Sequence, residues 1–212
     1  MFTGLIEEVG RVITVGAGED ANQLKIAAPR IAKKVRRGDS VSVNGCCLTL
    51  ASHRGGELAF DLLEETISRT NLKHLEQKRP VNLERALVAS DRFGGHFVQG
   101  HIDCVSPIIA YQKSGADFQL EIELPDAFAQ YVACKGSIAV NGISLTVAEI
   151  LPKSFVVWII PYTKTNTNLD RAQVGDLVNL EFDLLAKYVE RIISSHTTPV
   201  TDSVRKNRER RV

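Results

Sequence analysis

Two short stretches carry side chains that could do chemistry, and they are nearly the same stretch. Residues 43–50 read VNGCCLTL, and residues 140–147 read VNGISLTV, 97 positions later. The thiol of Cys47 in the first copy corresponds to the hydroxyl of Ser144 in the second, and a Leu-Thr pair follows each. Thiols and hydroxyls serve as nucleophiles or proton carriers when a base lies nearby. The repeated stretch therefore predicts two related polar sites.

The Asn-Gly dipeptide in each stretch predicts a β-hairpin with a type I′ turn, because that turn needs positive φ at both central residues. Strand alternation then sorts the side chains onto two faces. The core face receives Val41, Val43, Cys46, Leu48 and Leu50, and in the second copy Ile138, Val140, Ile143, Leu145 and Val147. The outward face receives Ser40, Ser42, Cys47 and Thr49, and in the second copy Ser137, Ala139, Ser144 and Thr146. That face is either ordinary solvated sheet or a ligand site; its small polar groups, with no lysine or glutamate, favour a ligand site.

Further blocks return at the same spacing, so the chain consists of two copies of one module. The repeated blocks are Thr70-Asn71-Leu72 with Thr167-Asn168-Leu169, and Val81-Asn82-Leu83-Glu84 with Val178-Asn179-Leu180-Glu181. Near the start the spacing is 96, with Gly4-Leu5-Ile6-Glu7 matching Gly100-His101-Ile102-Asp103. We predict a first module over residues 1–96 and a second over 97–183. Residues 91–96, with their paired glycines, are the expected linker.

The elements that must position these residues are short strands. Alternating apolar runs in the first module predict strands at residues 11–15, 23–27, 40–43, 46–50, 58–63 and 81–87. Such runs indicate a small antiparallel barrel or sandwich, with brief helices at 30–35 and 66–75. Residues 184–196 differ, because Leu184, Leu185, Tyr188, Val189, Ile192 and Ile193 recur at helical spacing. This amphipathic helix either packs on its own barrel or associates with copies of itself.

Composition excludes several classes of protein. The 212 residues are 44% apolar and 24% charged, as in globular proteins, and 26 basic residues balance 25 acidic ones. This balance creates no field for nucleic acid or an anionic membrane, and a nucleic-acid-binding barrel would need a basic groove with exposed aromatics. No apolar run approaches the length of about 18 residues that spans a membrane, so we expect a cytoplasmic protein. The basic tail, residues 197–212, is read as a solvated terminus, with RNA contact as the alternative.

Together these motifs resemble the riboflavin synthases of the alpha-chain type, a family built from lumazine-binding repeats. The resemblance rests on Met1-Phe2-Thr3-Gly4, the two hairpins, Gly94-Gly95-His96 and Gly100-His101, and it covers residues 1–193. Asn141 stands where the family pattern has an acidic residue. The resemblance implies an all-β fold of two six-stranded Greek-key barrels with a C-terminal helix. It also implies a homotrimer whose sites are shared between subunits, and lumazine synthase as a further partner.

The resemblance also implies a reaction. Two molecules of 6,7-dimethyl-8-ribityllumazine dismutate: a four-carbon unit moves from one to the other, giving riboflavin and 5-amino-6-ribitylamino-pyrimidinedione. The reaction needs no metal and no redox cofactor. Because both reactants are the same compound, the duplication has a chemical reason: two related pockets hold two copies of one heterocycle face to face in opposite roles.

Residue roles follow from the same resemblance. It assigns catalysis to His101, Cys47, Ser144, Thr146 and Asp183. It assigns substrate binding to Gly4, Leu5, Ile6, Cys47, Leu48, Thr49, Asp61, Leu62, Leu63, Glu64, Glu65, Thr66, Gly100, His101, Ile102, Lys135, Ser144, Leu145, Thr146, Ile159, Ile160, Pro161, Tyr162, Thr163 and Lys164.

Three alternatives stay open. His101 suits proton transfer, because imidazole titrates near neutral pH, but a ribityl hydroxyl of the substrate is an alternative base. Cys47 is either a nucleophile or a polar contact. A non-catalytic lumazine- or flavin-binding antenna protein of the same fold is the rival function, and the retained Thr3, Cys47, His101, Ser144 and Thr146 favour the enzyme.

Overall fold

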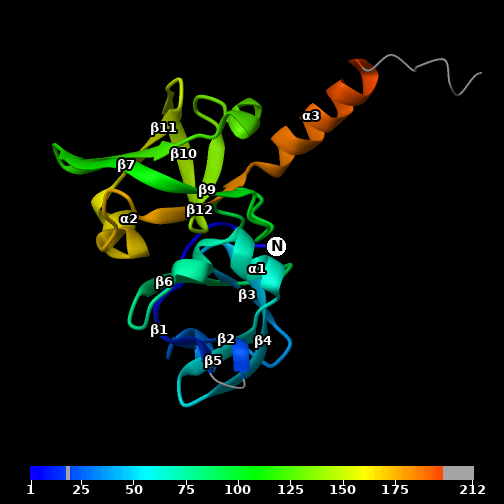
Figure 1. Ribbon diagram of the computed structural model, residues 1–212, viewed down its shortest axis with the longest axis vertical. Helices are drawn as coiled ribbons and strands as arrows, with labels where there is room; N and C mark the ends of the chain where they lie inside the picture. Colours follow the sequence, from blue (N-terminus) through cyan, green and yellow to red (C-terminus); the bar gives the residue numbers. More distant parts are fainter. Residues whose placement is uncertain (18–19, 198–212) are drawn as a thin grey trace, which may run out of the picture.

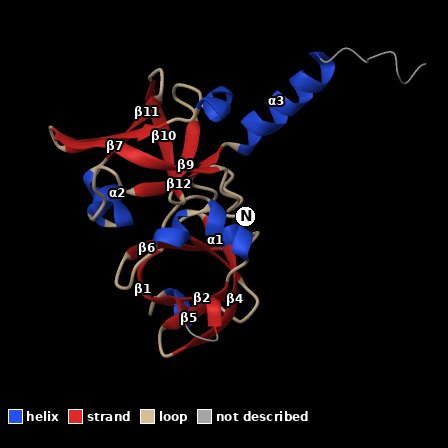
Figure 2. Cartoon of the chain, viewed as in Figure 1, coloured by secondary structure: helices blue, strands red, loops and turns tan. Residues whose placement is uncertain are grey.

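The computed structural model describes residues 1–17 and 20–197 and contains two closed six-stranded antiparallel barrels followed by a helix (Figures 1 and 2). The first barrel consists of β1 (Glu8–Ala17), β2 (Asp20–Ala27), β3 (Ser40–Val43), β4 (Cys46–Arg54), β5 (Glu57–Asp61) and β6 (Pro80–Arg85). The second consists of β7 (Cys104–Ser114), β8 (Asp117–Glu123), β9 (Ser137–Val140), β10 (Ile143–Ile150), β11 (Ser154–Ile159) and β12 (Leu177–Phe182). The predicted pair of barrels is confirmed.

Both barrels have the same strand order, which is the structural counterpart of the sequence repeat. In the first, the circuit runs β1-β2-β5-β4-β3-β6, and in the second each strand is replaced by its equivalent six strands later. Each barrel closes around its own apolar core, with Phe60 and Leu83 fully buried in the first and Phe155 and Leu180 in the second. Closure pairs every strand on both sides, so neither module has an exposed sheet edge.

The connections hold short helices: η1 (Ile31–Lys33), α1 (Glu64–Arg69), η2 (Asn71–His74), η3 (Asp126–Tyr131), α2 (Pro161–Thr165) and η4 (Asn168–Asp170). The brief helices predicted at residues 30–35 and 66–75 are present, and the second region contains two of them, because Thr70 adopts an extended conformation between α1 and η2. Its hydroxyl accepts the Leu72 N–H and so caps η2. Thr167 makes the same bond to Leu169 N–H in the second module.

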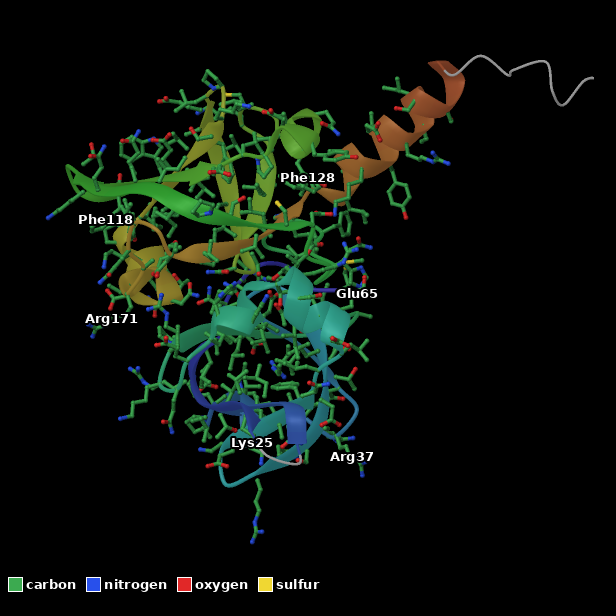
Figure 3. The ribbon with its side chains drawn as sticks, in the orientation of Figure 1. Lys25, Arg37, Glu65, Phe118, Phe128 and Arg171 are labelled. Carbon is green, nitrogen blue, oxygen red and sulfur yellow. The ribbon has the colours of Figure 1, made fainter. Side chains whose placement is uncertain are left out.

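The terminal helix α3 (Leu184–Thr197) is present as predicted and extends away from the second barrel (Figure 1). Phe128 on η3 lies beside its start (Figure 3) and stacks on Phe182. The stripe of α3 that follows stays uncovered, with Leu185, Tyr188 and Val189 each 55–59% exposed. Packing of this stripe on its own barrel is therefore the wrong alternative. Across residues 1–17 and 20–197, no helix has the length and apolar character needed to cross a membrane.

The repeated hairpins form as predicted. Positive φ values of 46° at Asn44 and 81° at Gly45 make the first turn, and Asn141 and Gly142 repeat them at 47° and 76°. The predicted pairs of Val43 with Cys46, Ser42 with Cys47 and Val41 with Leu48 are present, and the second copy pairs identically. The two-residue turn sets this register because so short a loop allows only one pairing of the strands that it joins.

The two turns meet at the centre of the molecule. A Cβ added to Gly45 would lie 2.7 Å from the Gly142 nitrogen, and one added to Gly142 would lie 2.7 Å from the Gly45 nitrogen. No side chain fits at either position. The barrels are thus related by an approximate two-fold axis that passes between these glycines.

Six asparagines surround this axis and join the barrels: Asn44, Asn71 and Asn82, with their equivalents Asn141, Asn168 and Asn179. The Asn82 amide donates to the Asn141 carbonyl (3.0 Å), and the Asn179 amide donates to the Asn44 carbonyl (2.8 Å). The Asn71 N–H donates to Asn179 Oδ1, and the Asn168 N–H donates to Asn82 Oδ1, each at 2.7 Å. Each of these bonds has a counterpart in the other direction, so the network holds the barrels together in one orientation.

Asn179→Ala should destabilise the whole protein by about 2–4 kcal/mol, because it leaves the buried Asn71 N–H and Asn44 carbonyl without partners. The free energy of unfolding from urea titrations measures this loss. Asn22→Ala, which truncates an exposed asparagine, is the control and should change stability by less than about 0.5 kcal/mol. Equal effects of the two substitutions would contradict the role given to the network.

Candidate functional site

Only part of the predicted outward face of each hairpin is exposed to solvent. Thr49 and Thr146 are exposed, as predicted, and Cys47 and Ser144 are half-buried. Ser42, predicted on the same face, is 1% exposed, because Gly142 of the other hairpin packs against its hydroxyl. Its equivalent Ala139 is buried as well. The prediction is therefore wrong for the half of the face nearest the turn, which forms the contact between barrels.

The segment that leads into each barrel lies across the hairpin of the other barrel. The Gly100 carbonyl, from the second repeat, accepts the Cys47 N–H at 2.8 Å, and the Gly4 carbonyl, from the first repeat, accepts the Ser144 N–H at 2.8 Å. A Cβ at Gly4 would lie 2.6 Å from the Ser144 Cβ, and one at Gly100 would lie 2.4 Å from the Cys47 Cβ. Only glycine allows this approach. The exchange places His101 beside Cys47 and Leu5 beside Ser144.

Two buried glutamates hold the leading segments in place. Glu84 accepts from the Thr3 N–H and hydroxyl and from the Gly4 N–H, at 2.7–3.0 Å. Its equivalent Glu181 accepts from the N–H groups of Gln99 and Gly100. Burial raises the pKa of both carboxyl groups, and these hydrogen bonds oppose that rise. The exchange also carries Ile6 onto the second core and Ile102 onto the first.

The first site, which we call the Cys47 patch, comprises Cys47, Thr49, Asp61 and His101; the predicted Thr66 is half-buried on α1, which follows β5. Leu50 pairs with Phe60 across β4 and β5, so Thr49 and Asp61 face each other one step further on. Strand β5 ends at Asp61 and therefore does not reach Cys47. The Cys47 N–H donates instead to the Gly100 carbonyl. Thr49, Asp61 and His101 are exposed, so the patch is an open surface of the single chain.

The second site, the Ser144 patch, comprises Leu5, Ser144, Thr146 and Trp158; the predicted Thr163 is half-buried on α2. Val147 pairs with Val157, which sets Thr146 opposite Trp158 in the same way. Leu5 is 50% exposed and Trp158 is 43% exposed, so this patch is open too. The patches occupy equivalent places on the two barrels, but an acid in the first stands where an indole stands in the second.

His96 joins the Ser144 patch, although the sequence placed it in the linker. Its Nδ1 lies 2.7 Å from the Ser144 Oγ, and its side chain is almost fully buried, with Nε2 lacking a partner among the described residues. Burial lowers the pKa of His96, which the nearby Asp183 carboxylate partly opposes. The imidazole is therefore neutral at pH 7 and able to accept a proton. The Gly-Gly-His motif was the available signal: a Cβ on Gly95 would lie 1.9 Å from the Thr3 carbonyl oxygen, so the linker lies directly on the site.

Several predicted binding residues offer only their main chain. The side chains of Leu48, Leu62, Leu145 and Ile159 are buried in the barrel cores. The rim of each patch is exposed instead, with Leu63, Glu64 and Glu65 in the first barrel and Ile160, Pro161 and Tyr162 in the second. Glu65 extends from α1 in Figure 3 and pairs with Arg69.

Of three further predicted residues, Lys164 and Asp183 have hydrogen-bond partners and Lys135 has no ion-pair partner among the described residues. Lys164 bonds Asp170 at 2.8 Å and lies over the Phe118 ring, so its charge is neutralised locally. The Asp183 carboxylate accepts the Leu185 N–H at the start of α3. Lys135 is exposed and forms no ion pair with any described residue.

A cavity of about 330 Å³ lies on the axis between the barrels, away from both patches. Its walls include Asn44, Asn71, Asn141 and Asn168, and Arg171 lies at this side of the molecule (Figure 3). None of the predicted site residues lines it. The asparagines are already hydrogen-bonded to one another, so they offer little to a ligand.

Sequence comparison identifies the family. The model of the lumazine binding domain matches residues 3–86 and 99–183, one match for each repeat. Riboflavin synthase of Mycobacterium tuberculosis is 44% identical over 199 residues, covering 92% of this chain and 99% of the relative. Riboflavin synthase of Actinobacillus pleuropneumoniae is 40% identical over 193 residues, covering 91% and 90%. The chain therefore belongs to the lumazine binding domain family and, within it, to the riboflavin synthases, which confirms the resemblance.

Solved structures agree with this assignment. LumP complexed with riboflavin superposes with a TM-score of 0.80 at 25% identity, covering 86% of this chain and 99% of LumP. LumP complexed with 6,7-dimethyl-8-(1′-D-ribityl) lumazine gives a TM-score of 0.77 at 25% identity, covering 85% and 98%. Both neighbours bind the ligand class that the sequence predicted.

The buried His96 should make stability fall as the pH decreases below about 6.5, the ordinary pKa of histidine. The unfolded chain binds a proton there that the folded imidazole resists, so the free energy of unfolding drops until the lowered folded pKa is passed. His96→Asn, which keeps a polar atom near Nδ1 but does not titrate, should flatten this part of the profile. Urea titrations at a series of pH values measure it, with His53→Asn, an exposed histidine, as control. A His96→Asn profile as steep as that of the wild type would contradict the burial argument.

Proposed function

We propose that this protein is a riboflavin synthase that converts two molecules of 6,7-dimethyl-8-ribityllumazine into riboflavin and 5-amino-6-ribitylamino-pyrimidinedione. The observation that carries the proposal is the pair of equivalent but chemically different patches. Each offers a thiol or hydroxyl beside a threonine, at the place where the leading segment of the other repeat crosses the hairpin. Two related pockets suit a reaction between two copies of one heterocycle.

The residues divide the chemistry between them. Main-chain groups of residues 4–6 and 100–102, with Thr66 and Thr163, bind the heterocycle and its ribityl chain. In the Cys47 patch, His101 transfers protons and Cys47 contacts the ring. In the Ser144 patch, the neutral His96 accepts a proton from Ser144 while Asp183 stabilises the resulting imidazolium. Holding both rings in register contributes about 7–11 kcal/mol toward lowering the barrier of a bimolecular step.

The working site is shared between subunits of a homotrimer. Both patches are open surfaces in the single chain. Ring chemistry of this kind benefits from exclusion of water, so each patch needs a further surface to cover it. Docking the Cys47 patch of one subunit onto the Ser144 patch of the next encloses both rings. The uncovered apolar stripe of α3 supplies the association surface, because exposed stripes of this kind bury themselves in a helix partner. The cytoplasmic location and the association with lumazine synthase stay predictions.

Incubating the purified protein with 6,7-dimethyl-8-ribityllumazine should produce riboflavin, followed by its absorbance. Ser144→Ala, which removes the hydroxyl hydrogen-bonded to His96, should lower kcat by about 10²–10⁴-fold, the usual range for a lost proton-transfer group. Ser52→Ala, an exposed serine on β4, is the matched control. Tight binding of the lumazine by the wild-type protein without turnover would overturn the enzyme and support a binding protein like LumP.

Leu185→Glu with Val189→Glu should give a monomer with little activity, because two carboxylates in the apolar stripe oppose its burial. The native mass from light scattering and the rate of riboflavin formation are measured together. Arg191→Glu adds an acid on another side of α3 and should keep both the assembly and the activity. A double variant that is monomeric and fully active would refute a site shared between subunits.

A further inference from the structure

The leading segments of the two barrels, residues 3–7 and 99–103, end on equivalent carboxylates. Glu7 ends the first segment and Asp103 ends the second. The N–H of each donates to a leucine carbonyl on the last strand of its own barrel, at 2.9 Å. Each carboxylate accepts the N–H of the residue two positions beyond that leucine, also at 2.9 Å. The main-chain part of this arrangement is therefore the same in both repeats.

The cation that pairs with each carboxylate comes from a different element. In the first repeat Arg85, on β6, bonds Glu7 through its own guanidinium at 3.0–3.1 Å. The equivalent residue of the second repeat is Phe182, which is buried in the core and carries no charge. Lys187 of α3 supplies the cation instead, with its Nζ 2.6 Å from the Asp103 Oδ2. The second leading segment is therefore held by a residue from outside its barrel.

The pair of Lys187 with Asp103 is largely shielded from water. The side chains of Lys187 and Asp103 are 24% and 21% exposed, against 36% and 30% for Arg85 and Glu7. Salt screens a shielded pair less than an open one, and removal of one partner leaves the other charge uncompensated. Lys187 is thus bound to the second leading segment, although it lies on the helix whose apolar stripe stays uncovered.

A second acid lies near Lys187. Glu181 accepts the N–H groups of Gln99 and Gly100, at the other end of the segment. Burial raises the pKa of Glu181, and the charge of Lys187 lowers it. One ammonium therefore faces both carboxylates that hold the second leading segment, and His101 lies between the two points of attachment.

We infer that Lys187 is a positioning residue of the Cys47 patch: through Asp103, α3 holds the second leading segment, and His101 with it, against Cys47. The Gly100 carbonyl accepts the Cys47 N–H at 2.8 Å, so a segment released at Asp103 also loosens from the hairpin. This inference rests on the proposed function and adds a second role for α3, which then sets the geometry of a site as well as supplying the association surface. The first leading segment does not depend on α3, because its cation lies on β6 of its own barrel.

Lys187→Met keeps an unbranched apolar stem and removes the charge, so residues 99–103 should lose protection from amide hydrogen exchange. NMR of the full-length protein follows the N–H groups of Gln99, Gly100 and Asp103, and that of Cys47. Riboflavin formation should slow by up to about 10²-fold, the cost of moving a reacting group by about 1 Å. The native mass from light scattering should not change.

The matched control is Arg85→Met, which breaks the equivalent pair in the first barrel. It should expose residues 3–7 to exchange and leave residues 99–103 protected, whereas Lys187→Met should do the reverse. Protection of residues 3–7 in Lys187→Met also shows that the barrels stay folded. Lys187→Arg keeps the charge and should restore both the protection and the rate. Asp103→Asn should reproduce Lys187→Met, and the two changes together should not add, because both remove one interaction.

Unchanged exchange of residues 99–103 in Lys187→Met would overturn the inference, and so would equal behaviour of the Arg and Met variants. A native mass that falls while residues 99–103 stay protected would overturn it too, because Lys187 would then act on assembly alone. A protein that shows the expected exchange but whose wild type forms no riboflavin would overturn the proposed function instead.

Discussion

The structure depends on the contact between two Asn-Gly turns across an approximate two-fold axis. Gly45 and Gly142 approach so closely that any side chain would collide with the opposite backbone. Around them, asparagine side chains satisfy main-chain groups of the other barrel, in pairs that exchange roles across the axis. Buried polar groups are costly unless all are bonded, so this network accepts only one relative placement of the barrels. The rest of the molecule follows from that placement.

One consequence is the exchange of leading segments. Because the hairpins meet at the axis, the strand before each barrel crosses to the other hairpin and bonds Cys47 or Ser144 through a glycine carbonyl. Each patch is therefore built from both repeats. A single repeat would lack the segment that completes its site, which explains in physical terms why the two copies remain in one chain.

A second consequence is chemical. Duplication alone would produce two identical patches, and the framework is indeed nearly identical, from the turn angles to the strand register. The repeats differ mainly at exposed positions whose side chains do not pack in a core. Examples are Lys135, Trp158 and Tyr162, which correspond to Gly38, Asp61 and Glu65. Such positions can change charge at little cost in stability. The fold thus separates a framework that is the same in both repeats from two surfaces that differ in their side chains.

Much of this could be read from the residues in order. The 97-residue repeat, the type I′ hairpins and the assignment of Cys46 and Ile143 to cores follow from local rules: turn geometry fixes register, and register fixes which face each side chain takes. The stripe of α3 follows likewise from helical spacing. Local rules predicted helical structure around Thr70 but not the break there, where the Thr70 side chain caps the next turn.

The sequence by itself determined the repeat, the barrels and the pairing of Cys47 with Ser144, because each depends on contacts between near neighbours in the chain. Only the tertiary structure decided that Ser42 is buried, that His101 lies with Cys47, and that His96 bonds Ser144. These facts depend on how one barrel meets the other, which is set by hydrogen bonds between residues 48 to 135 positions apart. The periodicity of the sequence within either repeat does not predict these contacts between the barrels.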